Sequence, residues 1–365
     1  MGWSQELLHV RATALCLCLV PSLGAQNLTR IAPDKCNECK IEVVSRGNLA
    51  LKSVELVRSV RARRMPTGYT VITDAFGRGT YVVVDSQGRV ISTRSASGGG
   101  PGEFRQIDFV EPCRGDSLLV YDGVARRFSV LTRRGEYWRS FPFLGLVSSA
   151  VCTPQQIVLW GGSPNKPRGT TRLIVMDYTG NVVVEHEAQL SDGTTGGFMR
   201  AYRLLAMAGS NTALTIPAES YALEQFDLTD GSQRILVREL DWFPRRPTGS
   251  QRLPPWVARP TPRVSSFQID REGRLWTLIV AAHPNWKKAD QFSLQKPPSL
   301  NEKEKYFQAI VEVVDPRTAT AIASVQLPGS VTGFLDDSTV YALRERDDGT
   351  LAIAVWMLRL TPPRR

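Results

Sequence analysis

The sequence has few of the residues that build metal and redox sites. Its 365 residues include 3 His and 6 Cys, and aromatic residues make up 8% of the chain. Zinc sites draw most of their ligands from His and Cys. This scarcity argues against a metalloenzyme that depends on histidine ligands, and we predict no resident metal and no assigned catalytic residue.

Long hydrophobic runs are also missing, since a transmembrane helix needs about 20 apolar residues. Residues 12–20 form a short apolar stretch behind Arg11, and small residues follow at Gly24 and Ala25. This pattern is typical of a secretory signal peptide, with a buried N-terminal helix as the alternative. We therefore predict a signal peptide over residues 1–25.

The remaining chain, residues 26–365, is predicted to be one exported domain in the periplasm or outside the cell, without a transmembrane segment. It is long enough for a large core, and 42% of the whole sequence is hydrophobic. We expect a monomer.

Four cysteines remain after cleavage, an even number that favours disulfides in an oxidising compartment. The spacing of Cys36 and Cys39 fits a redox dithiol, half a zinc site or a small structural bridge. Because no thioredoxin-like βαβ pattern and no second Cys-x-x-Cys follow, we favour the bridge. Cys113 and Cys152 either pair or remain small buried hydrophobes.

Charge of one sign is in excess: 45 Lys+Arg face 35 Asp+Glu, a net charge of +10. Nucleic-acid binding requires a basic face that lies in one groove. The arginine clusters fall instead in turns of different repeats, so we expect solvated surface, no nucleic acid, and anionic glycans or lipids as conceivable partners. The clusters are Arg61/Arg63/Arg64, Arg126/Arg127, Arg133/Arg134 and Arg245/Arg246.

Short β-rich runs recur along the chain, and hairpins with Gly, Asp or Asn turns follow most of them. No helical periodicity of comparable length competes with them. Four strands per repeat and about six repeats predict an all-β, six-bladed β-propeller with four-stranded antiparallel blades. The runs begin at Thr80, Leu118, Ile157, Ala213, Leu275 and Val340.

The two ends of the chain complete the predicted ring. Residues 351–358 lack a following partner strand, so we predict that residues 41–44 pair beside them and close the last blade. In the first repeat, residues 69–94 hold either the first three strands or the last hairpin and one strand before it.

Two insertions interrupt the repeats, at 241–263, which is rich in Pro and Arg, and at 283–306, which includes a predicted short helix near 300–306. Long loops on a rigid scaffold often carry function. We predict that a ligand or partner meets the mouth that these loops form. The candidate contacts are Trp242, Arg245, Arg246, Trp256, His283 and Trp286.

The segment Gly98-Gly99-Gly100-Pro101-Gly102-Glu103-Phe104, followed by hairpin residues 115–131, resembles the NHL-like propellers, above all the exported bacterial TolB-like group. The resemblance is carried by residues 88–141, and the Cys36–Cys39 start is similar too. It implies a six-bladed fold with the glycine segment as a junction between blades. It implies no particular chemistry, because such propellers host binding platforms as well as lyases and lactonases.

Catalytic candidates are sparse. We interpret His186 as an ordinary strand residue and His283 as the more interesting histidine, because it begins an insertion. Strand-end acids such as Asp108, Asp270 and Asp336 suggest no defined calcium set. We therefore predict a binding or scaffold module for a protein or an anionic ligand. The alternative is a calcium-dependent lactonase or lyase in the central tunnel.

Overall fold

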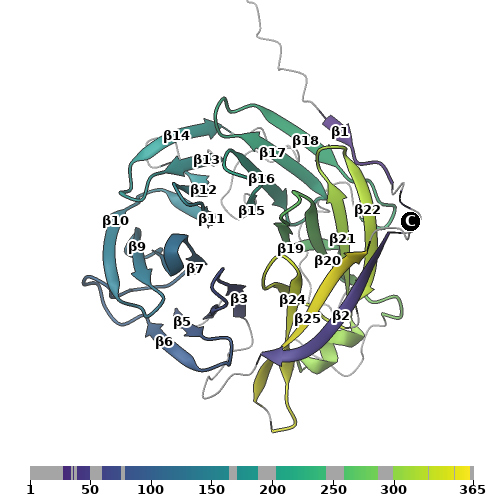
Figure 1. Ribbon diagram of the computed structural model, residues 1–365, viewed down its shortest axis with the longest axis horizontal. Helices are drawn as coiled ribbons and strands as arrows, with labels where there is room; N and C mark the ends of the chain where they lie inside the picture. The colour runs from purple at the N-terminus through teal and green to yellow at the C-terminus, as the bar shows by residue number, and fades with distance from the viewer. Residues whose placement is uncertain are drawn as a thin grey trace, which may run out of the picture.

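The computed structural model describes residues 28–33, 36, 39–49, 60–74, 79–163, 171–187, 203–243, 259–286, 299–327, 329–348 and 350–361. Within these ranges the strands form six sheets around a central axis (Figure 1), which confirms the all-β six-bladed propeller. The helical elements of the described residues are two 3-10 turns, η1 (Arg114–Asp116) and η2 (Asn301–Lys305). The second turn confirms the short helix predicted near residues 300–306.

Each blade contains four antiparallel strands, and blade 4 has a fifth strand added at its outer edge. From the axis outward, blade 1 contains β3 (Val60–Arg64), β4 (Thr70–Asp74), β5 (Thr80–Val84) and β6 (Val90–Ser95). Blade 2 contains β7 (Phe109–Pro112), β8 (Ser117–Asp122), β9 (Arg127–Thr132) and β10 (Tyr137–Pro142). Blade 3 contains β11 (Leu146–Cys152), β12 (Ile157–Gly162), β13 (Thr171–Met176) and β14 (Val182–Glu187). Blade 4 contains β15 (Arg203–Met207), β16 (Thr212–Pro217), β17 (Ala222–Asp227) and β18 (Gln233–Val237). Blade 5 contains β19 (Arg263–Ile269), β20 (Leu275–Ala282), β21 (Phe307–Asp315) and β22 (Thr320–Leu327). Blade 6 contains β23 (Gly333–Phe334), β24 (Thr339–Glu345), β25 (Leu351–Thr361) and β2 (Lys40–Leu49).

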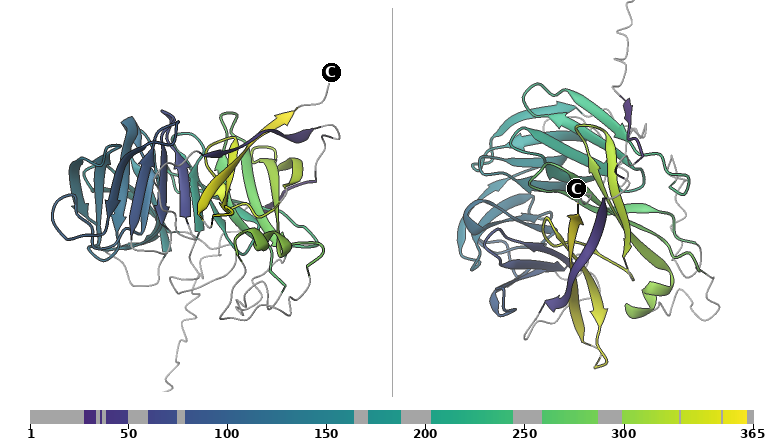
Figure 2. Two further views of the ribbon diagram at one scale, coloured as in Figure 1. Left: turned by 90° about the horizontal axis from the view of Figure 1, so that it is seen from below. Right: turned by 45° about the vertical axis from the view of Figure 1, so that its right-hand side comes forward.

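The N-terminal strand β2 closes the ring as predicted. It pairs antiparallel with β25, from Lys40 opposite Thr361 to Leu49 opposite Ile353. The last blade thus takes its outer strand from the start of the chain, and this pairing joins the two ends of the ring (Figure 2).

The structure decides between the two interpretations of the first repeat. Strand β3 lies innermost, so residues 69–94 hold the second, third and fourth strands of blade 1. The run that begins at Thr80 is therefore a third strand, whereas the other five runs are second strands. The pattern of β3 is hard to recognise because its buried side, Val60 and Ala62, is only two residues long.

Residues before β2 add a strand that the sequence pattern did not predict. Strand β1 (Leu28–Arg30) lies parallel to β18 as a fifth strand of blade 4. Ala32 then forms a bridge with Thr320 of blade 5. The described parts of residues 28–49 therefore lie along the outer edges of blades 4, 5 and 6 in turn.

Buried apolar side chains form six clusters, one at each contact between neighbouring blades. Both faces of a blade are therefore buried. In β8, for example, Leu118 packs toward blade 1 and its neighbour Leu119 toward blade 3. This explains why the second strands are continuous apolar runs, since each such burial contributes about 1.5–3 kcal/mol.

The glycine segment Gly98–Phe104 joins blades 1 and 2. Arg127 donates to the carbonyl oxygens of Gly99, Gly100 and Glu103, and the buried carboxylate of Asp122 accepts the amides that follow this segment. Phe104 is fully buried between the two blades. The junction predicted from the resemblance is confirmed, and its charged neighbours hold it in place.

Both cysteine pairs lie within disulfide-bonding distance. The Cα atoms of Cys36 and Cys39 are 5.4 Å apart, and those of Cys113 and Cys152 are 5.1 Å apart. The second pair connects the turn after β7 with the end of β11, so it links blades 2 and 3. Of the two fates considered for Cys113 and Cys152, pairing is the one observed.

The predicted signal peptide, residues 1–25, lies outside the described residues, as do large parts of both insertions. Among the described residues, no helix is long and apolar enough to cross a membrane.

Candidate functional site

The long connections of the propeller leave the ring on one side. Because neighbouring strands run antiparallel, the connections between second and third strands and those between successive blades emerge together. We call this the loop side; η2 marks it at the lower edge of the left view in Figure 2. The described ends of both predicted insertions, 241–263 and 283–306, lie on this side, since one follows β18 and the other follows β20.

Trp242 lies on the loop side just after β18. Its side chain is 43% exposed and meets the ring of Phe243 edge-on, with 6.0 Å between the ring centroids. Phe243 is buried and contacts Tyr221 of blade 4 at 5.8 Å. Phe243 is thus the anchor of this connection, and Trp242 remains available for a partner.

His283 and Trp286 form a turn at the end of β20. The His283 amide donates to Tyr306 O, while its Nδ1 accepts the amide of Asn285 at 3.1 Å. The Trp286 amide donates to His283 O, and its side chain is half-buried. The imidazole therefore stabilises its own turn. The other candidates, Arg245, Arg246 and Trp256, lie outside the described residues.

Sequence reasoning missed an exposed apolar patch on the loop side. Val124, Leu144 and Leu146 are 54%, 65% and 44% exposed. Their two connections are joined, because the Phe143 amide donates to Arg126 O, 2.8 Å away. Nothing in the repeat pattern marks these positions, since Val124 and Leu144 lie between strands and Leu146 is the first residue of β11. We call these three side chains the apolar patch.

Charged side chains on the innermost strands lie near the axis. Arg61 and Arg63 alternate with the buried residues of β3, and Glu111 is on β7 of the next blade. Burial raises the pKa of Glu111, an effect that the charges of Arg63 and Arg61 oppose. Two cations beside one half-buried carboxylate favour an anion at the axis over a cation.

The three acids considered for calcium have other partners. Asp108 lies beside Gln106, Asp270 accepts from Arg274 and the Trp276 indole, and Asp336 pairs with Arg64. Among the described residues, no group of three His, Cys, Asp or Glu side chains is placed to hold a metal ion.

Two buried ion pairs occupy equivalent positions in blades 4 and 5. Glu224 lies opposite Thr215 and pairs with Arg203 at 3.1 Å; Glu312 lies opposite Thr277 and pairs with Arg238 at 2.9 Å. Each glutamate faces the preceding blade, and both are nearly inaccessible to solvent.

Tyr221 completes the second pair, because its hydroxyl lies 2.6 Å from Glu312 Oε2 and 2.6 Å from Thr277 Oγ1. Burial, reinforced by the Glu312 charge, raises the pKa of Tyr221 well above its usual value. These groups face other side chains rather than a cavity, so we interpret them as contacts that hold neighbouring blades together.

His186 is half-buried on β14, and its Nε2 lies 3.1 Å from Leu228 O of blade 4. The prediction of a strand residue is confirmed, but its partner is a backbone carbonyl rather than a carboxylate. The role of His186 is therefore structural.

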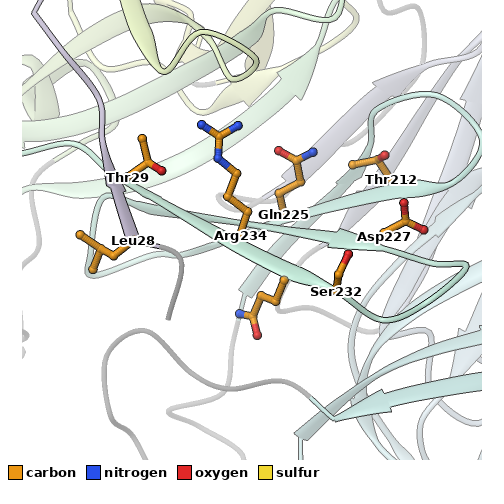
Figure 3. A pocket seen from close by; sticks show the side chains of 8 residues that line it. Leu28, Thr29, Thr212, Gln225, Asp227, Ser232 and Arg234 are labelled. Carbon is orange, nitrogen blue, oxygen red and sulfur yellow. The ribbon is translucent and has the colours of Figure 1, made fainter. Parts of the chain in front are cut away.

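A polar pocket of about 440 Å³ opens at the outer edge of blade 4 (Figure 3). Strand β1 borders it with Leu28 and Thr29, and β17 and β18 line its floor. Its polar lining residues are Thr212, Gln225, Asp227, Ser232, Gln233 and Arg234. None of the predicted site residues lines the pocket.

No protein-family model matches the chain, and no curated protein matches it. Solved structures do. A member of the DUF4221 family from Bacteroides vulgatus is 12% identical, with a TM-score of 0.62, over 90% of this chain and all of that one. A protein described as exported, from Bacteroides fragilis, is 10% identical with a TM-score of 0.56, over 92% of this chain and all of that one.

A luciferin-regenerating enzyme is 12% identical with a TM-score of 0.49, over 88% of this chain and 97% of that one. At these identities the similarity shows the six-bladed fold alone. The disulfides and the exported neighbour are compatible with export.

Proposed function

We propose that this chain is an exported binding propeller that holds a protein partner on its loop side. The apolar patch carries the proposal. Its three aliphatic side chains are 44–65% exposed, although most apolar side chains at the contacts between blades are buried. An exposed apolar patch beside polar surface is typical of a protein interface. Trp242, 43% exposed on the same side, adds an aromatic contact of the kind that dominates interface energetics.

Photo-crosslinking tests this proposal. A photoreactive amino acid at Leu144 is expected to trap one discrete partner in the native envelope fraction, and Leu146→Asp is expected to abolish that product. The matched control position is Val183 on outer strand β14, which is 63% exposed but away from the patch. The trapped protein is then purified and rebound. Equal products from both positions, or no loss with Leu146→Asp, would refute the loop side as the interface.

An anionic ligand is the second candidate, and the pair Arg61 and Arg63 beside the axis supports it. Retention on a heparin column measures this attraction. Charge reversal at Arg61 and Arg63 is expected to lower retention, and charge reversal at Arg245 and Arg246 tests the insertion separately. Unchanged heparin retention in both charge-reversal variants would refute the hypothesis of an anionic ligand.

The alternative of a calcium-dependent lactonase or lyase requires several oxygen ligands near the axis. Glu111 is the axial carboxylate that the described residues offer, and its arginine neighbours disfavour a cation. A rise in Tm on adding calcium would nonetheless restore this alternative over the binding function.

A further inference from the structure

The outermost strand of a blade presents an unpaired backbone edge, which can accept a strand from another chain. In five of the six blades, the pairing of this strand with its inner neighbour shifts by one residue. Such a β-bulge bends the edge and blunts it. The extra residues are Ile91 in β6, Trp138 in β10, Val183 in β14, Ile322 in β22 and Val44 in β2.

Blade 4 is the exception. Its outer strand β18 pairs with β17 without a shift, from Val237 opposite Ala222 to Gln233 opposite Phe226. It is also the outer strand that carries a complete further strand, β1, in parallel. The regular edge is therefore the edge that accepts a strand.

Strand β1 is held by its backbone and by one side chain. The Ile31 amide donates to Val237 O at 2.8 Å, and the Ile31 side chain is 4% exposed between blades 4 and 5. Leu28 is 55% exposed, and Arg30 makes a 3.8 Å ion pair with Glu239 at the surface. Such exposed pairs contribute little. The attachment therefore depends mainly on Ile31.

The polar pocket continues this edge. Leu28 lies opposite Ile235, and the two residues of the sheet before Ile235, Arg234 and Gln233, line the pocket. In Figure 3, Thr212, Gln225, Asp227 and Arg234 point to the same side of the sheet. A strand that extends upstream of Leu28 would meet this lining.

We propose that the outer edge of blade 4 is a strand-addition site for an extended segment of a partner polypeptide, with residues 28–32 as its internal occupant. The incoming segment runs parallel to β18. It presents a branched apolar side chain where Ile31 lies, a small residue where Ala32 lies, and polar residues upstream at the pocket. Backbone hydrogen bonds supply affinity and the two side-chain positions supply specificity. This site is separate from the loop side.

Peptide binding tests the proposal. The probe is a fluorescent peptide of residues 25–33, and the proteins are the chain that begins at Gln26 and its variants Ile31→Ser and Arg30→Ser. In the wild-type chain the tethered strand competes at an effective concentration of about 1 mM. We expect Ile31→Ser to bind the peptide at least about tenfold more tightly than wild type, a difference of about 1.4 kcal/mol.

Arg30→Ser introduces the same residue at an exposed neighbour and is expected to behave as wild type. A peptide in which the isoleucine is replaced by Asp is expected to lose binding. A peptide that lacks residues 25–27 is expected to bind several-fold more weakly, because it does not reach the pocket.

A second variant guards against a folding defect in Ile31→Ser. A chain that begins at Pro33 lacks the whole internal occupant, and it should also bind the peptide once circular dichroism shows that it is folded. The proposal is overturned if the peptide binds equally to wild type, Ile31→Ser and the shortened chain, or if it binds to none of the three. Concentration-dependent doubling of the mass of the wild-type chain would assign the edge to a second copy instead and overturn the partner assignment.

Discussion

Replacing Arg238 with Leu removes the cation that faces Glu312 between blades 4 and 5. The guanidinium Nη2 lies 2.9 Å and Nε 3.1 Å from Glu312 Oε1, and the two side chains are only 12% and 6% exposed. Leaving one partner of a buried pair uncompensated destabilises a protein by about 3–5 kcal/mol. We expect the low end, about 3 kcal/mol, because the Tyr221 hydroxyl still donates to the carboxylate.

Urea-induced unfolding followed by circular dichroism measures the change. The double variant Arg238→Leu/Glu312→Leu is expected to recover most of the loss, because replacing both members of a buried pair with apolar residues is often neutral. Arg30→Leu is the matched control. Its partner Glu239 lies 3.8 Å away and the arginine is 73% exposed, so we expect a loss of at most about 1 kcal/mol.

Two results would refute the reasoning. One is an Arg238→Leu variant no less stable than Arg30→Leu. The other is a double variant as unstable as the single one.

Three further outcomes are expected. Replacing Cys113 and Cys152 together by Ala should lower the unfolding free energy by about 3–4 kcal/mol, because the bridge closes a loop with a sequence separation of 39. Equal stability of the reduced and the oxidised wild-type chain would contradict this. Burial, helped by the Asp108 charge, raises the pKa of Tyr121 to about 12 from 10.0. Its contribution is therefore complete below pH 10 and lost as the pH rises toward 12, so Tyr121→Phe should flatten the alkaline fall in urea midpoint. Arg127→Gln removes three hydrogen bonds to carbonyl oxygens and should lower the unfolding free energy by about 1–3 kcal/mol without changing heparin retention. An unchanged Tm together with earlier elution from heparin would show that Arg127 binds anions rather than holding the junction.

The fold could be predicted where each strand is buried on both faces. Such strands, for example β8 and β12, are continuous apolar runs, and their turns carry Gly or Asp at fixed places. The closure by β2 followed from counting unpaired strands. Strand β1 could not be predicted in this way. Three residues carry no period, and their position depends on the unbulged edge of β18, which lies some 200 residues further along the chain.

The candidate site was less predictable because its signals are not local. Tryptophans and histidines attract attention in a sequence, yet His283 stabilises a turn and His186 a contact between blades. The apolar patch consists of ordinary aliphatic residues in connections or at the start of a strand, and only their exposure distinguishes them. Exposure is set by the tertiary fold, so Leu144 cannot be told from a core leucine by its neighbours in the chain.

The arginine clusters show why charge in a sequence is a weak sign of an anionic partner. Arg64 pairs with Asp336 across the closure of the ring, Arg127 holds the junction between blades 1 and 2, and Arg133 pairs with Asp116. Each of the three clusters within the described residues thus gives one guanidinium to a contact that orders a turn or joins two blades. A guanidinium held in this way has much of its charge compensated and its donors occupied. Arg61 and Arg63 lie beside one half-buried carboxylate, Glu111, on the innermost strands near the axis. Net charge alone therefore exaggerates the capacity of this propeller for anions, and the axis is where an anionic ligand should be sought.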